Sequence, residues 1–320
     1  MKENHQTEQE DPNFEKGNKT PIMELRPPDR LPGFRMTTRD VAILKAVYTH
    51  RLLTTAQIVD LLFPPEKGQR HQTKVSRARH RLKMLKRLGY LHQDEQPIRL
   101  KDGRKPYLYM LAKKALPLLA REYDVLQEDI SWKPRDNQLA WRYLEHLMAT
   151  NDVRIAIEIA ARRNGYLLNR WLDERTLKSQ EMKDSVEIQG SGGRVAVVPD
   201  GYFHLTVGQY SYHHMMEIDM GTETGLSDKY NRRTFSGKIQ AYLAYYVSGK
   251  YESRYGTSVM RVLTVTTGPG RMKNLKKIAE RLGGGEEFWF VTFDKVTPET
   301  VLTEPVWSVA GQDELRPLIW

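Results

Sequence analysis

Two apolar stretches that each carry an acidic residue constrain the fold of this chain most strongly. The first, residues 195–205, contains Asp200, and the second, residues 215–221, contains Glu217. Each has the composition of a β-strand with acids at or near its end, and the polar turn over residues 208–211 favours a hairpin between them. We therefore expect Asp200 and Glu217 to meet at one edge of a sheet.

The chemistry of this pair indicates a metal site. Two converging carboxylates supply the hard oxygen ligands that Mg²⁺ prefers. We expect Asp200 and Glu217 to be the ligands of Mg²⁺ or Mn²⁺. The alternative is that both acids cap strands and face water, because short motifs often match by chance.

The positive charge of the chain is concentrated in one segment. Residues 31–125 contain 20 Lys and Arg against 8 Asp and Glu, a net charge of +12, while the whole chain carries +10. The remainder, with 30 basic and 32 acidic residues, is nearly neutral. A basic module joined to a neutral one indicates a nucleic-acid partner, and 320 residues suffice for two domains.

Other features exclude several classes of protein. No stretch approaches the roughly 18 apolar residues of a membrane span, so no membrane partner is expected, and the polar N-terminus lacks a secretory signal. The absence of cysteine excludes disulfides and cysteine-based zinc sites and fits a cytoplasmic location. Residues 1–33 are polar and contain several prolines, so we expect a disordered tail.

Residues 34–126 have the pattern of a winged helix-turn-helix domain. The expected elements are a helix after Thr37 or Thr38, a short helix after Thr54 or Thr55, a long helix over residues 71–88, strands over residues 90–93 and 107–111 that flank a basic turn at 101–104, and a closing helix over residues 112–121. Domains of this class place one helix in the major groove of duplex DNA.

The long helix of this domain is predicted to contact the DNA. No acid occurs between residues 67 and 93, and four basic residues (Arg70, Lys74, Arg77 and Arg81) share one sector beside the apolar stripe, while the other basic residues of the helix broaden the surface. The alternative is an ordinary solvated helix face. The residues predicted to bind DNA are Arg70, Lys74, Arg77, Arg81 and Lys83 around the helix, with Arg104 and Lys105 in the wing.

Residues 137–297 predict a second domain with the element order α-β-β-β-α-β-α-β. The expected elements are a helix over residues 139–164, a strand over 166–172, the two acidic strands, a helix over 229–247, a strand over 258–266, a helix over 271–282 and a strand over 288–293. The fold class is therefore α+β or α/β. Residues 298–320 form a C-terminal extension to which the pattern assigns no structure.

This order and these acids resemble the PD-(D/E)XK nuclease-like superfamily. The first motif is present as Pro199-Asp200, and the second reads Glu217-Ile218-Asp219 where active members usually carry Glu-x-Lys. The resemblance implies that Asp200, Glu217 and the carbonyl of Ile218 hold Mg²⁺, and that a lysine positions or activates the attacking water.

Asp219 departs from this pattern, because a carboxylate cannot supply the positive charge of a lysine. A lysine of the following helix could replace it, and Lys238 is the candidate. The resemblance also implies an acid from the first helix, either Glu145 or Glu158. The catalytic residues predicted in this way are Asp200, Glu217, Asp219 and Lys238. The departure leaves open whether the chain is an enzyme or a nuclease-like fold kept for binding.

The chain as a whole is similar to the replication-relaxation family of bacterial plasmids and mobile elements. The similarity covers residues 35–295 and is sharpest in the Glu-Ile-Asp-x-Gly-Thr-Glu run at residues 217–223. It also includes His146, Trp171 and Glu174. The similarity implies a DNA-binding accessory protein that acts in replication or in the relaxation of origin DNA at mobilisation.

Two other functions are left open. A Mg²⁺-dependent site-specific endonuclease or nickase would need the two acids around one metal position and a lysine aimed at the same point. A transcriptional regulator would need only the winged helix and would be a homodimer that reads a palindromic site. Double-stranded DNA is the expected partner throughout, with replication or mobilisation proteins as further partners of the accessory protein.

Overall fold

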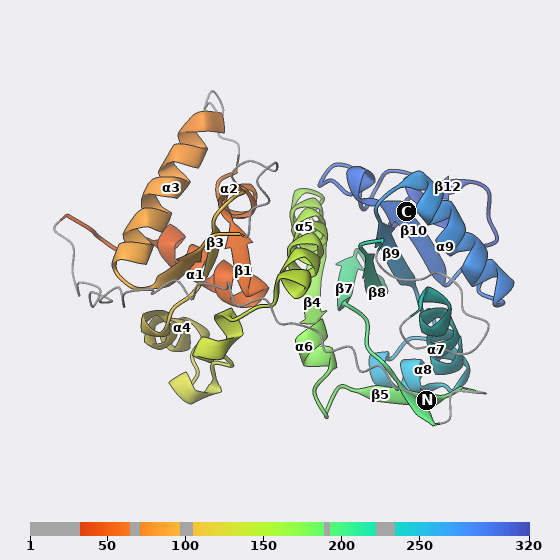
Figure 1. The fold of residues 1–320 in the computed structure, drawn as a ribbon. Coiled ribbons are helices and arrows are strands. Elements are labelled where there is room, and N and C mark those ends of the chain that lie inside the picture. Colours follow the sequence, from red (N-terminus) through yellow and green to blue (C-terminus); the bar gives the residue numbers. More distant parts are fainter. Residues whose placement is uncertain (1–32, 65–70, 97–104, 189–192, 222–233) are drawn as a thin grey trace, which may run out of the picture.

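The computed structural model describes residues 33–64, 71–96, 105–188, 193–221 and 234–320. Two bodies of the chain lie on either side of the central helix α5 (Trp141–Arg163) (Figure 1). The tail predicted for residues 1–33 lies outside the described residues except for its last position. Within the described ranges, no helix is both long enough and apolar enough to cross a membrane.

The N-terminal part contains the predicted order of helices and strands with one addition. Its elements are α1 (Thr38–His50), β1 (Leu52–Thr54), α2 (Thr55–Leu62), α3 (His71–Arg87), β2 (Leu91–Asp94), β3 (Leu108–Leu111) and α4 (Leu116–Tyr123), with 3-10 turns at Lys113–Ala115, Gln127–Asp129 and Pro134–Asn137. The strands form an antiparallel sheet in the order β1-β3-β2. The added strand, β1, is too short to show an alternating pattern in the sequence. The predicted basic turn at 101–104 lies outside the described residues.

Capping boxes determine where the first two helices begin. The backbone N–H of Asp40 donates to the hydroxyl of Thr37 at 3.3 Å, and the N–H of Thr37 donates to the Asp40 carboxylate at 2.7 Å, so Thr37 and not Thr38 is the cap. Thr54 and Gln57 make the same exchange before α2. A cap of this kind stabilises a helix by about 1 kcal/mol, because it satisfies N–H groups of the first turn.

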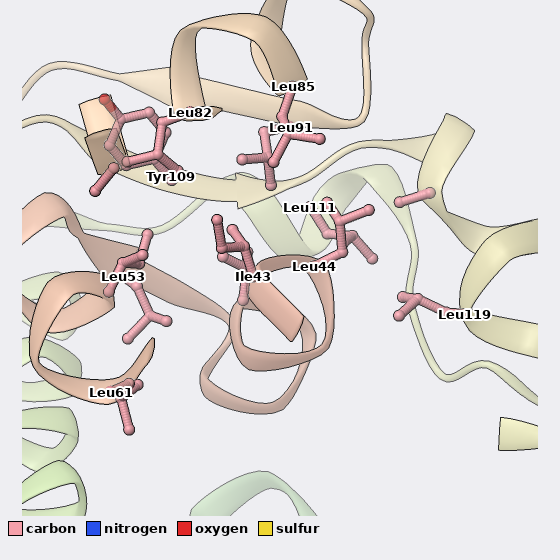
Figure 2. Close-up of a cluster of buried hydrophobic side chains, with 14 of the residues drawn as sticks. Ile43, Leu44, Leu53, Leu61, Leu82, Leu85, Leu91, Tyr109, Leu111 and Leu119 are labelled. Atoms are coloured by element: carbon pink, nitrogen blue, oxygen red, sulfur yellow. The ribbon is translucent and has the colours of Figure 1, made fainter. Parts of the chain in front are cut away.

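The core of the N-terminal part lies between α1, α3 and the small sheet (Figure 2). Ile43 of α1, Leu82 of α3 and Leu111 of β3 are almost completely buried, and each such side chain contributes about 1.5–3 kcal/mol. Ile155 and Ile159 of α5 belong to the same cluster. Other apolar residues of α5 pack on the large sheet, so this helix joins the two bodies.

The C-terminal part is built on a seven-stranded mixed sheet in the order β12-β11-β10-β9-β8-β7-β4. Its elements are β4 (Leu167–Asp173), α6 (Glu174–Leu177), β7 (Gly201–Val207), β8 (Tyr210–Asp219), α7 (Phe235–Val247), α8 (Lys250–Tyr255), β9 (Val262–Thr266), α9 (Pro269–Arg281), β10 (Phe288–Thr292), a 3-10 turn at Phe293–Lys295, β11 (Trp307–Val309) and β12 (Leu315–Arg316). β8, β9 and β10 are parallel, and the other neighbours pair antiparallel. The mixed α+β fold predicted from the sequence is confirmed.

The stretch 195–205 does not form the single strand that its sequence predicts. Its first residues belong to β6 (Arg194–Val197), which pairs with β5 (Asp184–Glu187) in a separate two-stranded sheet. The chain leaves this sheet at Pro199, because proline has no N–H to donate to a strand ladder. Asp200 therefore precedes β7 instead of ending a strand.

The C-terminal residues complete the large sheet. β11 and β12 extend it beyond β10, and Trp307, Leu318 and Ile319 are buried in its core. The sequence leaves residues 298–320 unassigned because strands of two or three residues carry no periodicity. The helix predicted over 229–247 begins at Phe235 in the described chain, after its cap Thr234, and residues 229–233 lie outside the described ranges.

Glu158 of α5 lies where this helix meets the N-terminal part. Its carboxylate accepts a hydrogen bond from Arg154 at 2.6 Å and lies 3.5 Å from Nε2 of His50. Burial acts to raise the pKa of Glu158, but the contacts with His50 and Arg154 outweigh it and lower this pKa to about 2. The folded pKa is below the ordinary value of 4.5, so the stabilisation is present above pH 4.5 and is lost as the pH falls toward 2.

Glu158→Gln is expected to lower the free energy of unfolding at pH 7 by about 3 kcal/mol, because the charge that carries this stabilisation is removed. The decline in stability between pH 5 and pH 2 should also become shallower, on the order of one ionisable group fewer. Urea unfolding over this pH range measures both effects. Glu145→Gln, on an exposed position of the same helix, is the matched control. Equal pH dependence in the two variants would contradict the assignment.

Candidate functional site

The β7–β8 hairpin brings the two predicted acids together. Its register pairs Gly201 with Met216, so Asp200 and Glu217 follow as neighbours at the end of the hairpin away from its turn. A carboxylate oxygen of Asp200, Oδ2, accepts a hydrogen bond from the backbone N–H of Ile218 at 2.8 Å. Glu217 is 4% exposed and Asp200 is 9% exposed. The predicted meeting of the two acids is therefore observed, and it lies in the interior of the protein.

Two residues of α7 hold the carboxylate of Glu217. Nζ of Lys238 donates to Oε2 at 2.9 Å, and the hydroxyl of Tyr242 donates to Oε1. Burial raises the pKa of Glu217 to about 7, partly offset by the charge of Lys238 and reinforced by that of Asp200. The lysine that the sequence assigns to this position is thus in contact with the acid pair. Tyr242, the other residue that contacts Glu217, belongs to no motif in the sequence. Its spacing from the neighbouring tyrosines is that of a residue packed on one face of a helix.

The first helix of the C-terminal part supplies a histidine to the site, and not the acid that the resemblance implies. Nε2 of His146 lies 3.2 Å from Oδ2 of Asp200. Glu145 is exposed, and Glu158 is engaged by Arg154. The two predicted acids are one residue before and twelve residues after His146, which are not the positions that face Asp200 on this helix.

The contacts of Asp200 keep it charged although it is buried. Burial acts to raise the pKa of Asp200, but the hydrogen bond from His146, the charges of His146 and Lys238 and the N–H of Ile218 together lower this pKa. In return, Asp200 raises the pKa of His146 against the opposite effect of burial. The pair therefore favours a carboxylate beside a protonated imidazole, whereas the neighbouring Glu217 accepts a proton more readily.

Asp219 is occupied by partners of its own. Arg271 of α9 donates to both of its carboxylate oxygens, at 2.9 and 2.8 Å, and the hydroxyl of Thr266 donates at 2.6 Å. Burial acts to raise the pKa of Asp219, but these contacts outweigh it and lower the pKa. The prediction of a catalytic role for Asp219 has no support in this geometry, because a bidentate arginine pair uses the oxygens that a ligand would need.

The donor set at Asp200 and Glu217 suits Mg²⁺ in its chemistry. Mg²⁺ is usually bound by one or two carboxylates together with water and substrate phosphates. Within the described ranges, no group of three or more His, Cys, Asp or Glu side chains is arranged to hold a metal ion. The protein would therefore provide two carboxylates, with the remaining ligands from solvent and substrate, and the contact between Lys238 and Glu217 would loosen when an ion binds.

The residues predicted to bind DNA have different surroundings along α3. Arg77 and Lys83 are exposed, and Lys105 is half-buried. Lys74 is only 8% exposed, because it lies beside the apolar stripe of its helix, so little of its side chain is accessible to DNA. Arg81 is engaged by Asp40 at 2.7 Å and lies over the ring of Phe34, so its charge is largely used within the protein. Arg70 and Arg104 lie outside the described residues.

The fold and the site together define an α+β protein in which a buried carboxylate pair, held by a lysine and a histidine, lies beside a basic helical part. Residues 44–260 match the replication-relaxation family. Since this match covers more than half of the chain, the protein belongs to that family and is a replication-related protein that acts on DNA. No curated protein matches the chain.

Two solved structures of the restriction endonuclease FokI are similar to parts of the chain. The one bound to DNA is 15% identical with a TM-score of 0.25, and the match covers 81% of this chain and 43% of that one. The other is 13% identical with a TM-score of 0.26, and the match covers 81% of this chain and 42% of that one. The chain thus spans less than half of the length of either.

Proposed function

We propose that this chain is a DNA-binding protein of plasmid or mobile-element replication or mobilisation whose C-terminal part hydrolyses a phosphodiester bond with Mg²⁺ or Mn²⁺. The observation that carries the proposal is the 2.9 Å contact between Lys238 and Glu217. Strand β8 carries Asp219 at the position where the Glu-x-Lys motif has its lysine. Lys238 of α7 supplies a lysine to the carboxylate pair instead. The charge of Lys238 also acts on Asp200, so one cation serves both acids.

Each residue of the site has a role in this proposal. Asp200 and Glu217 hold the ion, which when bound would offset charge on the phosphate group and lower the pKa of water. Lys238, with 27% of its side chain exposed, orients the water that attacks. His146, with 28% of its side chain exposed, can give or take a proton at Nε2. Tyr242 keeps the carboxylate of Glu217 in place.

The N-terminal part is inferred to be a winged helix-turn-helix domain that binds duplex DNA through α3. The order of three helices followed by a strand pair supports this, as does the small antiparallel sheet. Arg77 and Lys83 are the exposed basic residues of α3 within the predicted set. Basic side chains on such a helix neutralise phosphates or pair with guanine in the major groove.

Arg77→Ala and Lys83→Ala are each expected to weaken duplex binding several-fold and to lower the slope of log affinity against log salt by about 1, because each change removes about one phosphate contact. Fluorescence anisotropy at several salt concentrations measures both quantities. Lys295→Ala, an exposed lysine of the C-terminal part, is the control. Unchanged salt slopes in both α3 variants would exclude this face of the helix as the DNA contact.

Supercoiled plasmid incubated with the protein and Mg²⁺ or Mn²⁺ tests the hydrolytic part of the proposal. We expect conversion to nicked circles or linear DNA that is abolished by a chelator, because the two carboxylates alone cannot activate water. Duplex binding without any cleavage of supercoiled, linear or single-stranded DNA would contradict hydrolysis. That result would favour an accessory DNA-binding protein or a transcriptional regulator.

A further inference from the structure

A cleft between the N-terminal part and α5 leads to the His146–Asp200 pair. Its larger pocket has a volume of about 460 Å³, and a smaller pocket shares several lining residues with it and reaches His146 and Asp200. Three arginines line both pockets, namely Arg51, Arg154 and Arg175. The cleft therefore offers positive charge next to the candidate site, and one of the three arginines, Arg51, comes from the N-terminal part of the chain.

Arg51, which lies between α1 and β1, has an unusual backbone conformation. Its φ of 67° and ψ of −41° place it in a region that favours glycine, and Asp124 is the other non-glycine residue with a positive φ in the described chain. Strained backbone of this kind persists only where the surrounding structure fixes it, and it concentrates at functional sites.

Asn151 of α5 fixes this conformation. Its side-chain amide donates to the carbonyl of His50 at 3.2 Å and to the carbonyl of Leu52 at 2.9 Å, which are the residues on either side of Arg51. Asn151 is 3% exposed, so the two hydrogen bonds are shielded from water. The helix that carries His146 therefore also holds the backbone of Arg51 in place.

The guanidinium of Arg51 has capacity for an anion. Nη1 donates to the hydroxyl of Tyr143 at 2.7 Å, and Nε is buried without a hydrogen-bond partner in the described part of the chain. Among the described residues, no acid forms an ion pair with Arg51, whereas Arg154 is paired with Glu158 and Arg175 with Asp136. A buried donor without a partner costs stability, which a bound acceptor would recover.

We propose that Arg51 binds a phosphate group of the substrate next to the His146–Asp200 pair, so that the N-terminal part contributes a residue to the hydrolytic site. This rests on the proposed function for the identity of the substrate as a DNA strand. A guanidinium suits a phosphate because its planar donors bind two oxygens at once. The proposal also explains the strained backbone. The conformation of Arg51 directs its side chain from the N-terminal part toward the candidate site in the C-terminal part.

Arg51→Gly separates the side chain from the backbone strain. Glycine adopts a φ of 67° freely, so this variant should unfold at a temperature no lower than the wild type. It should nevertheless bind a phosphate-bearing ligand tenfold or more weakly, and Arg51→Lys should recover only part of the affinity because it lacks the planar donors. Arg121→Ala, an exposed arginine of α4, is the matched control and should bind as the wild type does.

Isothermal titration without divalent metal measures the affinities for a single-stranded tetranucleotide, a deoxynucleoside monophosphate and inorganic phosphate. Stronger binding of the tetranucleotide than of the monophosphate identifies a DNA strand as the source of the phosphate, and the reverse order identifies a free nucleotide. Affinities of Arg51→Gly within twofold of the wild type, or no binding of any of the three ligands by the wild type at millimolar concentration, would overturn the proposal.

The outcomes for Arg51 and for hydrolysis can be told apart. If wild-type protein cleaves DNA and Arg51→Gly binds phosphate unchanged, the assignment of Arg51 fails and the hydrolytic function stands. If no DNA is cleaved under any condition but phosphate binding depends on Arg51, the phosphate site stands and the hydrolytic function fails.

Discussion

Asp200→Asn is expected to reduce metal-dependent DNA hydrolysis on the order of a thousandfold. The substitution keeps the size of the side chain and an oxygen that can accept from the N–H of Ile218, but it removes the charge that would hold the ion. A metal ion contributes several kcal/mol to stabilising a phosphoryl transition state, and about 4 kcal/mol corresponds to a thousandfold change in rate. Initial rates of plasmid nicking in Mg²⁺ or Mn²⁺ measure the effect.

Binding of the metal provides a second measurement that does not depend on turnover. An ion that binds only the folded protein raises its melting temperature, so Mn²⁺ should stabilise the wild type and leave Asp200→Asn unchanged. Asp294→Asn, at an exposed position, is the control for removing one acid. A variant at Asp200 that retains more than a tenth of the wild-type rate would show that this carboxylate does not hold the ion.

The local part of the site could be predicted from the sequence to within two residues, because the turn of a hairpin fixes its register. The predicted turn over residues 208–211 would set Asp200 opposite Asp219, whereas the observed turn at residues 208–209 pairs Val207 with Tyr210 and so brings Asp200 opposite Glu217. Lys238 could be predicted because a buried carboxylate pair needs a compensating cation and the next helix starts nearby. Both inferences use neighbours along the chain.

Residues that reach the site from distant segments could not be predicted in this way. His146 lies 54 positions from its partner Asp200, and the spacing of α5 does not show which of its faces meets the hairpin. Arg271 lies 52 positions from Asp219, and its sequence context is that of an ordinary basic helix. Arg51 is distinguished by its positive φ, which only the structure shows. Such contacts depend on how helices pack on the sheet, which local periodicity does not determine.

The secondary structure also shows this difference between local and distant contacts. Elements of eight or more residues were predicted within a few positions at most ends, because their apolar period is long enough to read. The three-residue β1 and the short β11 and β12 were not, since their place in a sheet depends on partners far along the chain. The prediction of one strand through Pro199 is wrong, because the missing N–H of a proline favours a break in a strand.

Asp219→Asn is expected to affect folding stability far more than hydrolysis. Asp219 is 4% exposed, and losing its charge removes the ion pair that its carboxylate makes with Arg271, whose side chain is 20% exposed. Breaking a buried ion pair by removing one partner typically costs 3–5 kcal/mol, and we expect about 3 kcal/mol here because asparagine keeps one oxygen for Thr266. Urea unfolding at pH 7 measures the change, with Asp294→Asn again as the control.

The pair of Asp219 and Arg271 can be tested by a double-mutant cycle. Arg271→Gln alone should also destabilise the protein, whereas the double variant Asp219→Asn with Arg271→Gln should be less destabilised than the sum of the two, because it removes both charges of the ion pair together. Nicking rates of Asp219→Asn, measured well below its melting temperature, should stay within a few-fold of the wild type. Loss of nicking with unchanged stability would instead assign Asp219 to the catalytic set, as the linear motif predicts. The ion pair favours the first result, because it uses both oxygens of Asp219 within the fold and leaves Lys238 as the cation that serves Asp200 and Glu217.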